Sequence, residues 1–203
     1  VHVDAGLRCG DLGRRDEVNR VLISRIASMH LVPTEEALET LEDEGVEPER
    51  IHFVGSMRAQ TALRTLQAVR GRSVAAERGF ERDSYVLVNV GEPGNVDDPS
   101  RLRAARDGLS SAPLPVLVID DGGWTRSFDG DADFTAPSIT ISGPVEHDSM
   151  IALIRDAAAV LTDAGGVQVE ACVIGTPCIT LLPCTEQSQT TVVGANVLVP
   201  PDP

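Results

Sequence analysis

The chain has 203 residues, of which 42% are hydrophobic, so it can form one large domain or two small ones. Its formal net charge is -14, which makes nucleic acid and anionic membranes poor partners. The sequence has neither an apolar run near the roughly 18–20 residues that span a bilayer nor a basic-then-apolar leader, and we expect a soluble, cytoplasmic protein.

Short β-rich runs alternate with helical stretches along the chain, which is typical of βαβ units and a parallel sheet. In chain order, we expect strands at residues 1–4, 30–32, 51–54, 85–90, 115–119, 139–142, 160–162, 178–182 and 196–199. We expect helices at residues 17–28, 34–44, 57–69, 99–109, 149–158, 165–174 and 185–193. Thr34 is expected to cap the second helix, and Gly45 is expected to stop it.

The polar stretch 71–83 predicts a linker between two domains. Residues 84–203 hold a nearly complete Rossmann-like unit, and residues 1–70 correspond to the back half of another. Because the sequence starts within a strand and has no initiator Met, we expect a fragment that begins inside a fold.

All 17 basic residues are Arg. A GC-rich genome explains this composition, and so does a halophilic cytoplasm, where the Debye length falls from about 10 Å at 0.1 M salt to about 3 Å at 1 M. The four cysteines, Cys9, Cys172, Cys178 and Cys184, contain no CxxC pair. Free thiols in a reducing cytosol are therefore expected.

One strand-to-helix junction predicts an anion site. A strand ends at Thr162, Gly165 and Gly166 allow close approach to the backbone, and the following helix has free N–H groups that favour a phosphate. Glu170, one turn later, is placed to accept hydrogen bonds from a ribose. The alternative, a tight turn without a ligand, is the commoner meaning of an isolated Gly-Gly pair. Thr185 starts a second such helix, where capping is commoner than phosphate binding.

Ionisable residues gather near the start of the chain, around a strand end and a helix start. They are His2, Asp4, Arg8, Asp11, Asp16, Glu17 and Arg20. Mixed carboxylates and arginines suit acid–base work on a charged substrate. An equally weighted alternative is that Asp16 and Glu17 only favour a helix N-terminus.

No metal site is expected. The acidic stretch 129–133 resembles part of a calcium loop, but it lacks the later bidentate Glu and is interpreted as a solvated loop. His30 and His147 are isolated in the sequence, and neither is assigned a metal.

Taken together, several segments resemble the non-hydrolysing UDP-N-acetylglucosamine 2-epimerase family. The similar runs are residues 2–12 (HVDAGLRCGDL), 16–20 (DEVNR), 33–35 (PTE), 50–55 (RIHFVG), 161–171 (LTDAGGVQVEA) and 175–177 with 185–186 (GTP and TE). They follow the family's order across almost the whole chain, which is more specific than any single motif.

The resemblance implies an α/β fold of GT-B type. In this fold, two Rossmann-like domains hold a nucleotide sugar between them, and here the N-terminal domain is incomplete. The implied reaction inverts carbon 2 of the sugar by elimination and re-addition of UDP and needs no redox cofactor. The implied partner is a UDP-sugar, and the family also suggests a homodimer that supplies polysaccharide biosynthesis or protein glycosylation.

The same resemblance assigns roles to individual residues. Asp4 and Asp16 are expected to transfer protons, and Arg8 to stabilise or position charge. The expected substrate-binding residues are Gly165, Gly166, Glu170, Thr185, Glu186, Asn19 and Arg20.

Several positions depart from the family's motifs. Asp4 and Asp16 each replace a Glu, which withdraws the carboxylate by roughly 1.5 Å, and a misplacement of about 1 Å can cost about 100-fold in rate. The family's His-Arg-Arg run is gone from the segment at Gly91-Glu92-Pro93. Three further motif positions are altered, at Ala164, Val169 and Gln187.

Three hypotheses remain. We favour an epimerase, either for UDP-N-acetylglucosamine or for another UDP-sugar. The alternatives are a catalytically degenerate UDP-sugar-binding protein and a GT-B glycosyltransferase.

Overall fold

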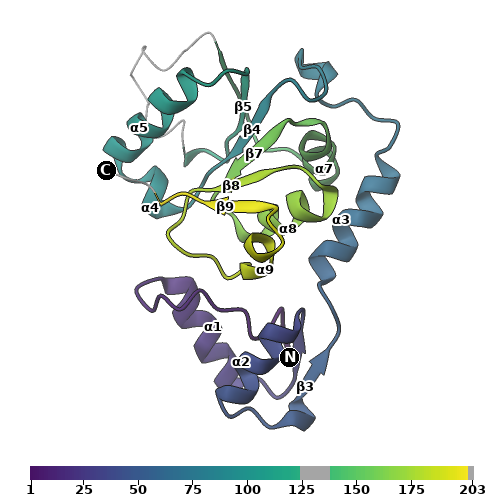
Figure 1. The fold of residues 1–203 in the computed structure, drawn as a ribbon, viewed down its shortest axis with the longest axis vertical. Helices are drawn as coiled ribbons and strands as arrows, with labels where there is room; N and C mark the ends of the chain where they lie inside the picture. The colour runs from purple at the N-terminus through teal and green to yellow at the C-terminus, as the bar shows by residue number, and fades with distance from the viewer. Residues whose placement is uncertain (124–137, 201–203) are drawn as a thin grey trace.

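The computed structural model describes residues 1–123 and 138–200. A small parallel sheet of order β1-β2-β3 starts the chain (Figure 1). Its elements are β1 His2–Val3, α1 Arg15–Ile26, β2 His30–Val32, α2 Glu35–Asp43, the 3-10 helix η1 Pro48–Arg50 and β3 Ile51–Phe53. Helix α2 packs on this sheet, because Val32 of β2 and Leu41 of α2 share one buried cluster.

A larger parallel sheet has the strand order β6-β5-β4-β7-β8-β9. Its strands are β4 Val86–Asn89, β5 Val116–Ile119, β6 Ile139–Ser142, β7 Ala159–Thr162, β8 Cys178–Thr180 and β9 Asn196–Leu198. The accompanying helices are α3 Met57–Ala68, η2 Ala76–Arg78, α4 Pro93–Val96, α5 Pro99–Ser110, α7 His147–Asp156, α8 Gly165–Ile174 and α9 Ser188–Val192. This is a doubly wound sheet.

The strand order reverses between β4 and β7. The chain builds outward from β4 to β5 and β6, and it then returns to the other side of β4 with β7. In open parallel sheets, ligands bind beyond the carboxyl ends of the strands at such a point. The loops after β4 and β7 are therefore the expected location of a site.

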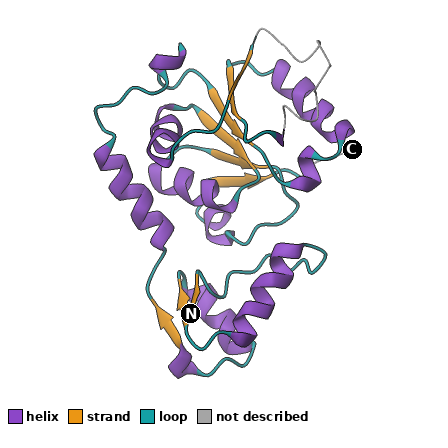
Figure 2. Cartoon of the chain, turned by 180° about the vertical axis from the view of Figure 1, so that it is seen from behind, coloured by secondary structure: helices purple, strands orange, loops and turns teal. Residues whose placement is uncertain are grey.

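Helices cover both faces of the larger sheet (Figure 2). Leu87 and Leu117 pack with Ile151 of α7 on one face, in the larger core cluster. Val88 and Val118 point to the other face and pack with Leu102 of α5. This alternation follows the two-residue period of a strand.

Helix α3 packs against α7 and α8 of the larger sheet, although it precedes the predicted linker 71–83. That linker contains the 3-10 helix η2, at residues 76–78. The predicted domains 1–70 and 84–203 stay a prediction, since this packing does not by itself assign α3 to either domain.

The predicted strands and helices agree with the structure to within a few residues, with exceptions at the start of α9 and at α4. Thr34 accepts a hydrogen bond from the N–H of Ala37, as the predicted cap does, and Gly45 follows α2 with a φ of 79°. The helix predicted at 185–193 was wrong at its start, because α9 spans only Ser188–Val192. The short helix α4, at residues 93–96, was not predicted.

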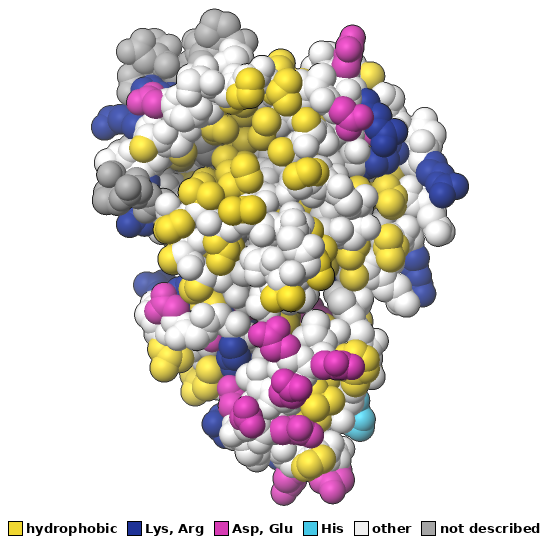
Figure 3. All heavy atoms as spheres, viewed as in Figure 1, with side chains coloured by type: hydrophobic (Ala, Val, Ile, Leu, Met, Phe, Trp, Pro, Cys, Tyr) yellow, Lys and Arg dark blue, Asp and Glu magenta, His cyan; other side chains and the backbone are white. Residues whose placement is uncertain are grey.

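Among the described residues, no helix is both long and apolar enough to cross a membrane. All four cysteines are unpaired. Burial raises the pKa values of Cys9 and Cys178 to about 11, so both remain protonated thiols at neutral pH. The small sheet β1-β2-β3 and its helices α1 and α2 form what we call the smaller unit. Acidic side chains gather on its outside (Figure 3), and α2 is rich in acidic residues.

Candidate active site

Helix α8 begins at the switch point, directly after β7. Ala164 precedes the helix without a side-chain cap, so no side chain of that residue satisfies the first N–H groups. A helix N-terminus carries a partial positive charge of about half a unit and favours anions. The geometry supports the predicted phosphate position at Gly165 and Gly166.

Both glycines lie directly against ionic side chains from other elements. A Cβ at Gly165 would lie 2.1 Å from Oε1 of Glu186, and a Cβ at Gly166 would lie 2.6 Å from Nη1 of Arg58. Glu186 also pairs with Arg20 of α1, at 3.2 Å between Oε1 and Nη2. A larger residue at either position would displace one of these groups from the helix start.

Glu170 lies one turn into α8, and its side chain is only 3% exposed. Its Oε1 is 3.2 Å from Nη1 of Arg58 and 3.2 Å from Nε2 of His147. The two partners come from α3 and α7, so Glu170 joins three helices. His147, which appeared isolated in the sequence, is therefore part of this cluster.

These three residues line a cavity of about 350 Å³ together with Asp4, Met57 and Thr61. We call it the Asp4 cavity. Asp4 follows β1, is half-buried and has a φ of 54°. A left-handed conformation at a non-glycine residue costs on the order of 1–3 kcal/mol and often marks a functional position. The cavity thus brings a catalytic candidate from the smaller unit to the nucleotide-binding candidate Glu170.

The N-termini of α3, α7 and α8 converge on the Asp4 cavity. Met57 and Arg58 begin α3, His147 begins α7, and Glu170 lies in the second turn of α8. Three positive helix ends make this a favourable place for an anionic ligand.

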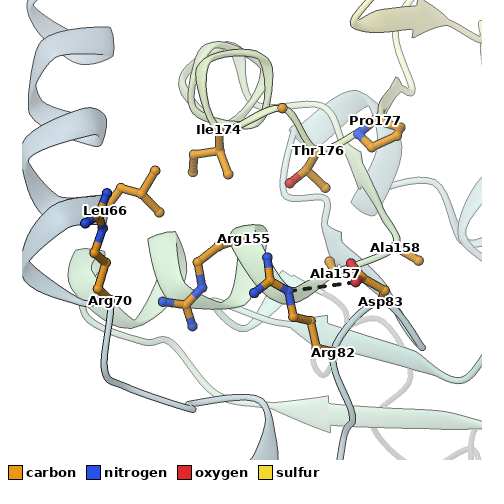
Figure 4. A pocket seen from close by; sticks show the side chains of 11 residues that line it. Leu66, Arg70, Arg82, Asp83, Arg155, Ala157, Ala158, Ile174, Thr176 and Pro177 are labelled. Carbon is orange, nitrogen blue, oxygen red and sulfur yellow. Dashed lines mark ion pairs between the residues drawn. The ribbon is translucent and has the colours of Figure 1, made fainter.

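A cavity of about 400 Å³ lies at the opposite ends of the same three helices (Figure 4). Arg70, Arg82 and Arg155 line it, but so do residues at the ends of α7 and α8, Ala157 and Gly175. Arg155 donates hydrogen bonds to the carbonyl oxygens of Val69 and Arg72 and pairs with Asp156.

Arg155 therefore uses its donors on the carbonyl oxygens at the C-terminal end of α3, and it is not a free cation available to an anionic ligand. Helix C-termini carry partial negative charge, which cations stabilise and which opposes the binding of an anion. Of these two cavities, the Asp4 cavity is the better candidate for a nucleotide sugar.

Asp16 lies outside the lining of the Asp4 cavity. It is exposed in the first turn of α1 and belongs to a group of carboxylates around Glu92. Burial raises the pKa of Glu92, Arg14 opposes that shift, and the charges of Asp16, Asp163 and Glu186 add to it. Arg14 reaches Glu92 at 3.7 Å between Nη2 and Oε1.

Asp163, between β7 and α8, holds the loop that follows β4. Its carboxylate accepts hydrogen bonds from the N–H groups of Gly91 and Glu92 at 3.0 and 2.9 Å. A third comes from Nδ2 of Asn95, at 2.9 Å. This links the two loops of the switch point and fixes the segment where the family's His-Arg-Arg run is missing.

Three predicted site residues, Arg8, Thr185 and Arg20, form hydrogen bonds or ion pairs with other side chains of the protein. Arg8 donates to both carboxylate oxygens of Glu44, to Ser24 and to the Leu7 carbonyl oxygen, which uses most of its donors. Thr185 donates to Oε1 of Gln168 at 2.7 Å.

Arg20 pairs with Glu17 as well as with Glu186. Asn19 is exposed on α1. The catalytic role of Arg8 stays a prediction, and its contacts favour a structural one.

Sequence reasoning did not identify Arg14, Arg58, His147 or Asp163 as site residues. Arg58 alone carried a usable indication, because an arginine in the first turn of a helix opposes the helix dipole. Glu17, grouped with the acid–base candidates, is buried and accepts hydrogen bonds from the N–H groups of Cys9 and Gly10. It therefore shapes the loop between β1 and α1.

Within residues 1–123 and 138–200, no group of three or more His, Cys, Asp or Glu residues is arranged to hold a metal ion. The acidic stretch 129–133, interpreted from the sequence as a solvated loop, lies outside the described residues.

Comparison with known proteins identifies the family of the chain. A family model described as UDP-N-acetylglucosamine 2-epimerase matches residues 1–203. The UDP-N-acetylglucosamine 2-epimerase of Methanocaldococcus jannaschii is 34% identical over 213 residues, covering 98% of this chain and 57% of that protein. The UDP-2,3-diacetamido-2,3-dideoxy-D-glucuronate 2-epimerase of Pseudomonas aeruginosa is 31% identical over 202 residues, covering 98% and 56% respectively.

A crystal structure of the M. jannaschii enzyme in complex with UDP-GlcNAc and UDP matches with a TM-score of 0.91 at 33% identity. The match covers 100% of this chain and 58% of that one. The predicted α/β fold of GT-B type is confirmed. The chain spans about 57% of the length of the M. jannaschii relative.

Proposed function

The chain belongs to the UDP-N-acetylglucosamine 2-epimerase family, and from that premise we propose that the protein is a UDP-sugar 2-epimerase. It interconverts UDP-N-acetylglucosamine and UDP-N-acetylmannosamine. The proposal is carried by one arrangement: the buried Glu170, on the helix whose glycine start is uncapped, lines the same cavity as Asp4.

The nucleotide half of the substrate binds at the start of α8, beside the larger sheet. The N–H groups at Gly165 and Gly166 bind the diphosphate, and Glu170 accepts a hydrogen bond from a ribose hydroxyl. Because Oε1 of Glu170 already has two partners, the ribose is bound by Oε2 or takes the place of one of them. Glu186 borders the same helix start, and Arg20 pairs with Glu186 from α1 of the smaller unit.

The sugar half faces Asp4. A carboxylate removes the proton from carbon 2, and the electron pair of that bond forms the double bond between carbons 1 and 2. UDP leaves carbon 1 with the electrons of the C–O bond. Carbon 2 then takes a proton on its other face, and UDP adds back. The net reaction exchanges one proton for another, so it needs no redox cofactor.

Asp4 is assigned one of these proton transfers because it lines the cavity. Asp16 is assigned the other from the family motif, and it lies on the first turn of α1. Both have shorter side chains than the family's Glu, so the backbone must bring each carboxylate closer to the sugar. A cytoplasmic homodimer that supplies surface polysaccharide or protein glycosylation is the setting we propose for the whole protein.

One observation favours a second candidate, a UDP-sugar-binding protein without turnover. The family's His-Arg-Arg run is absent from the segment at Gly91-Glu92-Pro93, and the pKa of Glu92 is raised by burial and by neighbouring carboxylates. That segment therefore offers a carboxyl group, and no cation of its own, where the family offers cations to the leaving UDP.

Proton NMR of UDP-N-acetylglucosamine with the protein in D2O, at low and high KCl, tests the proposal. The epimerase loses the carbon 2 proton signal and produces UDP-N-acetylmannosamine, and Asp4→Asn abolishes both changes. Line broadening without exchange supports the binding protein instead. The sugar named for the P. aeruginosa relative should be run in parallel, because exchange with that sugar alone would identify a different substrate.

A further inference from the structure

We propose that Arg58 binds the diphosphate of the UDP-sugar and supplies the positive charge that the missing His-Arg-Arg run would otherwise give. This assignment rests on the proposed function. It concerns a residue on α3 that no motif of the sequence identified.

The position of Arg58 on its helix is unfavourable without an anion. Ser56 caps α3, so Arg58 is the second helical residue and lies at the positive end of the helix. The first turn of α3 has no acidic residue. A cation at this end is opposed by the helix dipole, typically by 0.3–1 kcal/mol. A guanidinium retained there needs an anionic partner.

Glu170 satisfies only part of that need. Arg58 reaches it through one nitrogen, Nη1, at 3.2 Å, and the Arg58 side chain remains 50% exposed. An arginine has five N–H donors, so several remain for a second acceptor. Glu170 also has His147 as a partner and therefore stays hydrogen-bonded when Arg58 turns toward a ligand.

The guanidinium lies where the diphosphate is expected. A Cβ built on Gly166 would be 2.6 Å from Nη1 and 2.7 Å from Cζ of Arg58. Arg58 is thus packed against the first turn of α8, whose N–H groups are the proposed phosphate ligands. Two positive features this close repel each other, and an anion between them stabilises both.

Calorimetric titration with UDP and with uridine separates this role from a structural one. Arg58→Gln should weaken UDP binding about 10- to 100-fold and leave uridine binding unchanged, because only UDP carries the diphosphate. Arg58→Lys should retain part of the UDP affinity. Arg64→Gln, on the exposed side of the same helix, should bind both ligands as the unmodified protein does.

Equal UDP affinity in Arg58→Gln and the unmodified protein overturns the assignment and leaves the proposed function standing. Equal losses for UDP and uridine also overturn it, since they show that Arg58 only positions Glu170. If the unmodified protein binds no UDP, the proposed function falls and the assignment falls with it. Should Arg58→Gln not fold, Arg58→Lys compared with Arg64→Gln distinguishes the same outcomes.

Discussion

Arg58 and Glu170 lie 112 residues apart in the sequence, and they meet at 3.2 Å between Nη1 and Oε1. The contact joins α3 to α8, and both residues line the Asp4 cavity. It places a partly free cation and a buried carboxylate at a helix start where the family's nucleotide is expected.

Substituting Gly166 of α8 should reduce ligand binding without destabilising the fold. A Cβ at Gly166 meets the half-exposed guanidinium of Arg58, which can move aside. Alanine in a helix is favoured over glycine by about 1 kcal/mol. Gly166→Ala should therefore melt at or above the temperature of the unmodified protein while its UDP affinity falls at least about 10-fold.

Gly108→Ala is the matched control, because Gly108 lies in α5 and a Cβ added there would have no heavy atom within 4 Å. It should gain stability and keep full UDP affinity. Thermal unfolding and calorimetric titration of the two variants give the comparison. An unchanged UDP affinity in Gly166→Ala would remove the glycine start of α8 from the site.

Asp163→Asn should destabilise the larger sheet. The carboxylate accepts three hydrogen bonds from the loop after β4, and an amide leaves at least one of those donors unsatisfied. We expect a loss of about 2–4 kcal/mol in the free energy of unfolding. Urea unfolding measures it, with Asp107→Asn as the control, because Asp107 is exposed and pairs with neighbouring Arg106. Equal losses in the two variants would contradict the conclusion that Asp163 holds the loop after β4 in place.

The contribution of Glu17 to stability should depend on pH. Burial raises the pKa of Glu17, but the N–H groups of Gly10 and Cys9 and the charge of Arg20 outweigh it, so the net shift is downward. A carboxyl whose folded pKa is lowered contributes stability above its unfolded pKa of about 4.3, and that stability disappears as the pH falls through the folded pKa.

Glu17→Gln should accordingly lose about 1–2 kcal/mol at pH 7, and the deficit should shrink below about pH 4. Glu39→Gln, at an exposed position of α2, should show little loss at either pH. Denaturant unfolding at pH 7 and pH 3.5 provides the values. A deficit that stays constant between the two would show that the charge of Glu17 is not what stabilises the loop.

Salt should stabilise the protein. The formal net charge is -14, and α2 contains Glu35, Glu36, Glu39, Glu42 and Asp43 in one short helix. Shortening the Debye length from about 10 Å to about 3 Å weakens this repulsion. Between 0.1 and 1 M KCl we expect a gain of about 1–2 kcal/mol, or about 2–8 °C in Tm. A falling Tm would show that attractive ion pairs dominate the electrostatics.

The secondary structure could be predicted because its determinants are local. Thr34 caps α2 through a residue three positions later, and short apolar runs bounded by polar turns mark the buried strands. The start of α9 could not be predicted in the same way. Thr185 accepts a hydrogen bond from the N–H of Gln187, as a capping residue does, but this bond closes a turn and the helix begins only at Ser188.

Only part of the site could be predicted, because only part of it is formed by residues that are close together in the sequence. The glycine turn and Glu170 lie within one continuous motif, so their proximity follows from the sequence. Arg58 reaches Glu170 only through the packing of α3 on α8, which no spacing reveals. Arg8 shows the converse, since a residue inside a recognisable motif makes its closest ion pair with Glu44, outside that motif.

Hydrogen exchange of the protein with and without UDP-N-acetylglucosamine tests most directly where the ligand binds. We expect slower exchange in peptides covering residues 57–61 and 165–170, at the N-termini of α3 and α8, with residues 70–83 unchanged. Protection at 70–83 without protection at 165–170 would place the ligand in the arginine-lined cavity at the other ends of these helices and would contradict the proposed location of the site.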